Sequence, residues 1–166
     1  MRLPDHPTVP AVRRGVLDGL LVTVAVATVL VLSNVVFPAG PDESDDDPEY
    51  LVQLAAGYLL LFLVFALIGL HARRRSDSRW AGAAGGAAAG FVLAFGVLVT
   101  SLVIDNAFLS TVSQQHDKRI AFEASGWSSM RAYLTVRTLV GALAVIPGAT
   151  VIGGLLGAAG GLVRRR

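Results

Sequence analysis

The amino-acid sequence predicts an all-α integral membrane protein whose four spanning helices form one bundle. Of its 166 residues, 54% are hydrophobic and only 16% are charged, whereas charged residues make up about 25% of an ordinary soluble domain. Four long apolar stretches alternate with polar segments, and two of these stretches carry glycine and alanine at four-residue spacing. Composition and pattern together therefore favour a multi-pass membrane protein.

Each predicted span has at least about the 20 residues that a helix needs to cross a hydrocarbon core. The spans cover residues 15–37, 50–70, 80–104 and 136–163, which we interpret as one domain, 15–163, between a cytoplasmic tail, 1–14, and a basic cytoplasmic end, 164–166. We expect residues 1–12 to be unstructured, because they hold three prolines and no apolar period. A signal peptide is the alternative for the first span, but its apolar region exceeds the usual length of about 7–15 residues.

Small residues form two stripes that we predict to pack against each other. The third span holds Gly82, Gly86, Gly90 and Ala94, and the fourth holds Ala149, Gly153, Gly157 and Gly161. Residues four apart share one face of a helix, and small side chains let two backbones approach closely in a bilayer. The alternatives are that the stripes join copies of the chain into a homo-oligomer, or that they only reflect the glycine content of membrane helices.

Basic residues are distributed unequally between the two ends of the predicted helices. Ten of the fourteen fall on one side, namely Arg2, Arg13, Arg14, Arg73, Arg74, Arg75, Arg79, Arg164, Arg165 and Arg166. The positive-inside rule therefore predicts that both termini are cytoplasmic, an N-in/C-in arrangement that places both stripes in the inner half of the bilayer. Thirteen arginines beside one lysine suggest a GC-rich prokaryotic genome, and hence the cytoplasmic membrane of a prokaryote.

A polar segment joins the third and fourth spans, and we expect it to hold a short extracytoplasmic helix on the membrane surface. Ser125 and Gly126 should end that helix, and the next should begin near Met130 after a serine cap. The polar residues that would gather on this outer face are Asp105, His116, Asp117, Glu123, Arg131 and Arg137. We expect Arg137 to reach lipid phosphates or to pair with Asp105.

Carboxylates and histidines of this kind bind metals or move protons, but their spacing matches no known ligand set. We therefore predict no metal, no cofactor and no catalytic site. The acidic segment 42–49 holds six carboxylates without the spacing of an EF-hand, which favours a solvated loop over a calcium site. Asp18 lies one helical turn from Arg14, a spacing that allows an ion pair.

For function, the sequence favours a non-enzymatic accessory or structural subunit, because it contains no nucleophile-elbow, zincin, phosphate-loop or dinucleotide motif. A small transporter or channel acting as an oligomer is the alternative, suggested by Pro147 within the fourth span and by the charged Asp18 and Arg137. A lipid-modifying enzyme would have only the outer polar cluster to use. Expected partners are the bilayer and either another membrane protein or a second copy, but not nucleic acid, because the basic cluster 73–79 is a short connector between spans.

Overall fold

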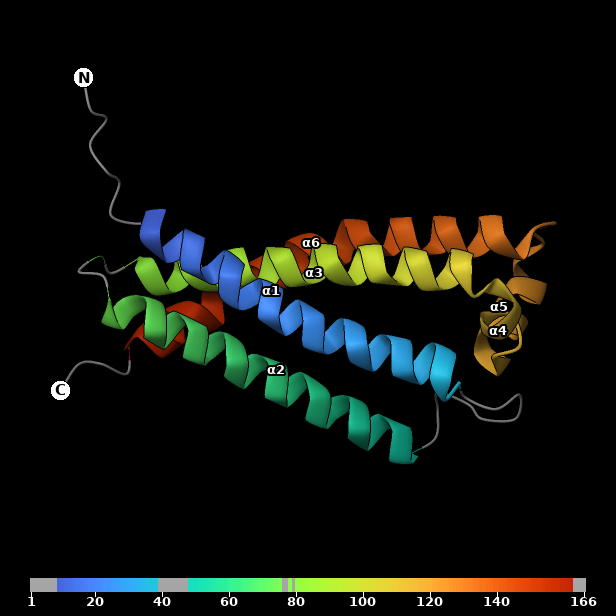
Figure 1. The fold of residues 1–166 in the computed structure, drawn as a ribbon, viewed down its shortest axis with the longest axis horizontal. Coiled ribbons are helices and arrows are strands. Elements are labelled where there is room, and N and C mark those ends of the chain that lie inside the picture. Colours follow the sequence, from blue (N-terminus) through green and yellow to red (C-terminus); the bar gives the residue numbers. More distant parts are fainter. Residues whose placement is uncertain (1–8, 39–47, 76–77, 79, 163–166) are drawn as a thin grey trace, which may run out of the picture.

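In the computed structural model, which describes residues 9–38, 48–75, 78 and 80–162, the chain forms a bundle of four long helices (Figure 1). They are α1 (Val9–Val31), continued by a π-helical turn η1 (Leu32–Val36), α2 (Pro48–Arg74), α3 (Ala81–Ala107) and α6 (Met130–Leu162). Two short helices, α4 (Leu109–Val112) and α5 (His116–Ser125), connect α3 to α6. The acidic residues 42–47, the basic residues 164–166 and residues 1–8 of the predicted tail lie outside the described residues.

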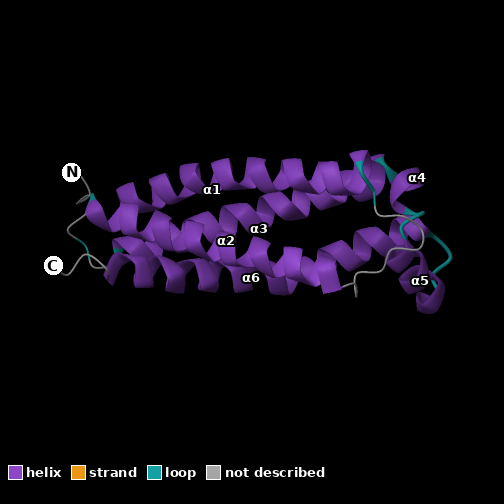
Figure 2. Cartoon of the chain, turned by 90° about the horizontal axis from the view of Figure 1, so that it is seen from below, coloured by secondary structure: helices purple, strands orange, loops and turns teal. Residues whose placement is uncertain are grey.

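The four long helices run in alternating directions (Figures 1 and 2). As a result α1 begins and α6 ends at the same end of the bundle, which we call the arginine end because Arg13 on α1 and Arg74 on α2 lie there. The helices α4 and α5 lie at the opposite end, which we call the cap end. Contacts centre on α3, which packs against α1, α2 and α6, while α2 also packs against α6 and scarcely contacts α1.

The outer surface of the bundle is apolar. Leu21, Leu63 and Leu143 are exposed over 72%, 62% and 77% of their surface, and a soluble protein would bury such side chains. Four helical segments of 24 to 33 residues are long and apolar enough to cross a membrane. These features indicate an integral membrane protein with four candidate spans.

The long helices extend beyond the predicted spans. The prediction that the chain is unstructured through Val12 is wrong for residues 9–12, because α1 already begins at Val9. Pro10 lies in its first turn and Pro48 begins α2; proline is tolerated there because a helix makes no use of the backbone N–H groups of its first turn. At the start of α6, the backbone N–H of Ala132 donates to Ser129 Oγ at 3.4 Å, so this serine acts as the cap.

The stripes of small residues meet where α3 packs against α6. The backbone of Gly86 lies against Gly153, that of Gly90 lies against Ala149, and that of Gly82 lies against Gly157. At each of these three α3 glycines a Cβ atom would overlap a carbonyl group of α6. The helices therefore approach through backbone atoms alone.

The remaining members of the stripes lie elsewhere. Ala94 is buried in α3 with 4% of its surface exposed. Gly161 faces the side chain of Arg73 on α2, which corrects the prediction that it packs against α3. Its neighbour Gly160 instead lies against the backbone of Ala66 on α2. The difference arises because α6 contacts α2 as well as α3 near the arginine end, so its last turns serve two partners.

Helix α1 packs on a second face of α3. Gly15 lies against the backbone of Gly85, and Gly19 lies against Ala89. The hydroxyl of Thr23 donates to the Gly19 carbonyl at 2.8 Å and lies 3.4 Å from the Val92 carbonyl oxygen across the interface. Small residues on α3 thus contact two neighbouring helices, of which the predicted pair of stripes indicated only α6.

Pro147 lies inside α6, and the helix continues through it. Figure 1 shows the two halves of α6 running in different directions. A proline within a helix removes one backbone hydrogen bond and crowds the preceding turn, which is a common cause of such a bend. The bend lets the first half of α6 follow α3 while its second half also reaches α2.

Candidate functional site

A polar cavity of about 550 Å³ lies at the cap end of the bundle. Residues of α1, η1, α2, α3, α5 and α6 line it, so nearly every element contributes to its wall. The ionisable residues in its lining are Asp105, His116, Asp117, Lys118 and Arg137. This concentration of polar groups, set in an otherwise apolar bundle, makes the cavity the candidate functional site.

Asp105 is the most deeply placed charge in the site, with 6% of its surface exposed near the end of α3. Its Oδ1 atom lies 3.4 Å from Lys118 Nζ of α5, and its Oδ2 atom accepts a hydrogen bond from Thr138 Oγ1 of α6 at 2.9 Å. Both carboxylate oxygens therefore have a partner, as a buried charge requires. Through Asp105, the cap helix α5 is linked to the spanning helices α3 and α6.

Asn34 connects the π-helical turn to the same network. The side chain of Gln115 lies 3.4 Å from both the carbonyl and the side-chain oxygen of Asn34, and Lys118 Nζ lies 3.4 Å from that side-chain oxygen. The turn itself is closed by a hydrogen bond of 2.7 Å from the Phe37 N–H to the Leu32 carbonyl. Isolated π-helical turns are rare and occur often at functional sites.

An apolar cluster beside the cavity holds these elements in place. Ile104 of α3, Val112 of α4 and Leu134 of α6 are exposed over 3%, 0% and 2% of their surface and pack together. Leu30 of α1 and Tyr133 of α6 pack against them. Because Ile104 precedes Asp105 and Leu134 lies one turn before Thr138, this cluster fixes the positions of both polar partners.

Arg137 lines the cavity without pairing with Asp105. In the described part of the chain no ion pair joins the two residues, and Arg137 is exposed. Lys118 and Thr138 already engage the two carboxylate oxygens. Of the two roles expected for Arg137, the pairing with Asp105 is therefore corrected, because Lys118 takes that place.

The structure divides the predicted outer cluster. His116 and Asp117 line the cavity together with Asp105 and Arg137. Glu123 instead lies 4.0 Å from Arg119 on the exposed surface of α5, and Arg131 is exposed and does not line the cavity. Among the described residues no three histidine, cysteine, aspartate or glutamate side chains come together as a metal site would require.

Sequence reasoning missed seven polar residues of the cavity lining, namely Ser33, Asn34, Gln53, Ser101, Gln115, Lys118 and Thr138. Of these residues Asn34 had a signal in the sequence, because it is a polar residue close to the end of an apolar span. Asn34 and Lys118 are 84 positions apart in the sequence, so no local pattern could predict their contact.

The cavity is large enough for a small molecule. Its volume of about 550 Å³ falls within the range of about 300–1,000 Å³ typical of small-molecule sites. Comparison of the chain with models of known protein families, with curated proteins and with solved structures finds no match. What the site does must therefore be argued from its geometry.

Proposed function

We propose that the protein is a non-enzymatic accessory subunit of a prokaryotic cytoplasmic membrane, with both termini inside and the polar cavity at the outer surface. One observation carries this proposal: the two ends of the bundle are built differently. Toward the arginine end, α2, α3 and α6 meet through the backbones of Gly69, Gly82 and Gly157. At the cap end the same bundle encloses a polar cavity.

This difference favours a scaffold over a transport path. A solute that crosses the membrane needs a lined passage through both halves of the protein. Between α3 and α6, however, the backbones are in contact over Gly82, Gly86 and Gly90, and no space remains there even for a methyl group. The small transporter or channel stays the second candidate, because a polar cavity accessible from one side is also what a solute-binding state would contain.

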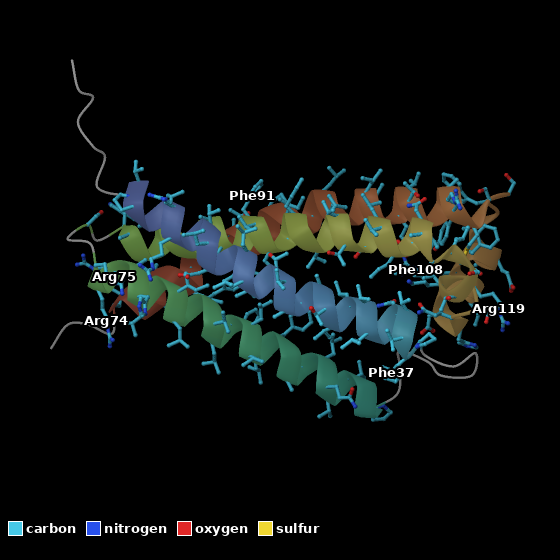
Figure 3. The ribbon with its side chains drawn as sticks, in the orientation of Figure 1. Phe37, Arg74, Arg75, Phe91, Phe108 and Arg119 are labelled. Atoms are coloured by element: carbon cyan, nitrogen blue, oxygen red, sulfur yellow. The ribbon has the colours of Figure 1, made fainter. Side chains whose placement is uncertain are left out.

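The arrangement of charges supports the orientation. Arg74 and Arg75 lie at one end of the bundle and Arg119 lies at the other (Figure 3). Arg13, Arg14 and Arg73 share the first end, so the described residues place more arginines there than at the cap end. By the positive-inside rule, the arginine end faces the cytoplasm.

Single cysteines can test this orientation cleanly, because the chain has none of its own. Ser128→Cys, at an exposed position of the cap end, should react with a membrane-impermeant maleimide in intact cells. Ser78→Cys, in the α2–α3 connection, should react only after permeabilisation. The reverse labelling pattern would overturn the proposed orientation.

Two measurements test the role of the protein. Native mass spectrometry of the chain purified from its own membrane in mild detergent should show a second membrane protein at fixed stoichiometry. A chain isolated only as a lipid-bound monomer would contradict an accessory role. In proteoliposomes the purified chain should add no flux of ions or small solutes above that of empty liposomes, whereas a flux that Arg137→Gln abolishes would establish the transporter instead.

A further inference from the structure

We propose that the cavity holds the headgroup of a zwitterionic phospholipid, which reaches it sideways from the bilayer past the first half of α2. The inference requires only that the four helices span a membrane, and it stands whether or not the protein is an accessory subunit. It rests on three observations: the way α2 leaves the bundle, the balance of charges in the cavity, and the depth of the site.

The first half of α2 stands apart from the other helices. Residues 51–60 are exposed without exception, whereas Phe65 and Ile68 in the second half have only 2% and 7% of their surface exposed. A Cβ atom at Gly57 would meet nothing within 4 Å, while one at Gly69 would overlap the backbone of Gly157. Figure 1 shows α2 diverging from α3 toward the cap end. Helix α2 is therefore attached to the bundle by its second half alone.

The diverging half of α2 borders the polar cavity. Gln53 lines the cavity and belongs to the exposed stretch, and Leu30 and Phe37 line the cavity on the side of α1 and η1. Since α1 and α2 scarcely contact each other within the described residues, we place the entry for lipid between these two helices. A molecule with a polar head and apolar chains fits such a site, because the head can enter the cavity while the chains lie along the exposed leucines of α2.

Charge decides which headgroup fits. The lining carries two cationic side chains, Lys118 and Arg137, and two carboxylates, Asp105 and Asp117. A ligand with one phosphate and one ammonium group leaves this balance neutral, whereas an anionic lipid would add an unbalanced charge beside the buried Asp105. Arg137, which has no ion pair with Asp105 in the described chain, offers the planar donors that bind phosphate in bidentate fashion.

The site also lies at the right depth. Asp105 is two residues from the end of α3, about 3 Å along the axis at 1.5 Å per residue. The ends of spanning helices lie at the level of the lipid headgroups. The phosphate of a lipid in the adjacent leaflet therefore reaches the cavity without leaving its layer.

Lipid retention measured by native mass spectrometry tests the proposal. The full-length protein in detergent is titrated with phosphatidylethanolamine or with phosphatidylglycerol of the same acyl chains. We expect phosphatidylethanolamine to bind at least about tenfold more tightly, and Arg137→Gln, which removes the donors for the phosphate, to weaken its binding to about the level of phosphatidylglycerol on the wild type. Arg131→Gln, an exposed arginine on the same helix that does not line the cavity, is the matched control and should bind as the wild type does.

A second measurement holds even if Arg137→Gln does not fold. Phosphatidylethanolamine with a photoreactive group in its acyl chain should label residues 51–60 of α2 in preference to residues 61–74. Equal labelling of both halves, or equal retention of the two lipids by the wild type, would show only unspecific lipid around the bundle and would overturn the proposal. Displacement of the lipid by free phosphoethanolamine at similar concentration would also overturn it, because the site would then recognise a soluble ligand.

Discussion

Gly86 of α3 lies with its backbone directly against the carbonyl group of Gly153 on α6, and a Cβ atom at either position would overlap the other residue. No side chain separates the two helices at this point. The stability of the contact therefore depends on the absence of a methyl group. This makes the interface sensitive to substitutions that most helices accept.

Gly86→Ala should lower the free energy of unfolding in detergent by about 1–3 kcal/mol, the usual cost of inserting a methylene group into a closely packed site. Gly141→Ala on α6 is the matched control, because a Cβ atom there meets nothing within 4 Å. The control should be neutral or slightly stabilising, since alanine favours a helix over glycine by up to about 1 kcal/mol. Equal thermal stability of the two variants would contradict the packing described above.

The attachment of α2 can be tested with two glycines on the same helix. Gly69→Ala should destabilise the bundle, because the new methyl group would overlap the backbone of Gly157. Gly57→Ala should not, because its surroundings are empty. Thermal unfolding of both variants in the same detergent is the measurement. A loss of stability in Gly57→Ala would show that the first half of α2 packs against the bundle.

A compensating pair probes the contact between α1 and α3. A Cβ atom at Gly96 would overlap the Cγ2 methyl group of Thr23, so Gly96→Ala alone should destabilise the protein. Thr23→Ser removes that methyl group and keeps the hydroxyl that donates to the Gly19 carbonyl. The double variant should therefore recover most of the lost stability in chemical denaturation. Additive losses in the double variant would place the two residues apart.

The Asp105–Lys118 pair should contribute measurably to the stability of the cap end. In a double-mutant cycle with Asp105→Asn and Lys118→Met, we expect a coupling energy of about 0.5–3 kcal/mol, as found for residues in one polar network. Glu123→Gln is the control, because its contact with Arg119 is exposed on both sides, and surface pairs of this kind contribute about 0–1 kcal/mol. A coupling near zero would mean that the buried pair does not hold α5 in place.

Much of the fold could be predicted because the length of each apolar stretch can be counted directly along the sequence. Each of the four helices that are long and apolar enough to cross a membrane overlaps one of the four predicted apolar stretches. The helix ends were harder to predict, since Pro10 was placed in the unstructured tail and Pro48 in the acidic loop, and yet both lie in first turns, where proline fits. Ser125 does end α5, followed by Gly126 with a φ of 71°, a backbone conformation that glycine adopts readily.

Less of the candidate site could be predicted. The residues Asp105, His116, Asp117 and Arg137 were expected to face one another, and they do line one cavity. The partner of Asp105 depends on where α5 lies over the end of the bundle. No local sequence pattern predicts that position. In the same way, Gly15 and Gly85 come into contact through the crossing of α1 and α3, although neither belongs to the two stripes that were predicted to pack together.

The glycine contact between α3 and α6 also has a consequence for the entropy of assembly. Glycine and alanine have no rotamers to lose when they are buried, whereas an ordered leucine loses about 0.5–1 kcal/mol. Glycine normally carries a cost in backbone freedom, but a spanning helix must satisfy its backbone hydrogen bonds within the bilayer before it meets a partner. The association of α3 with α6 through Gly86 and Gly153 therefore costs little side-chain entropy, so most of the dispersion attraction between the two backbones remains as net stabilisation.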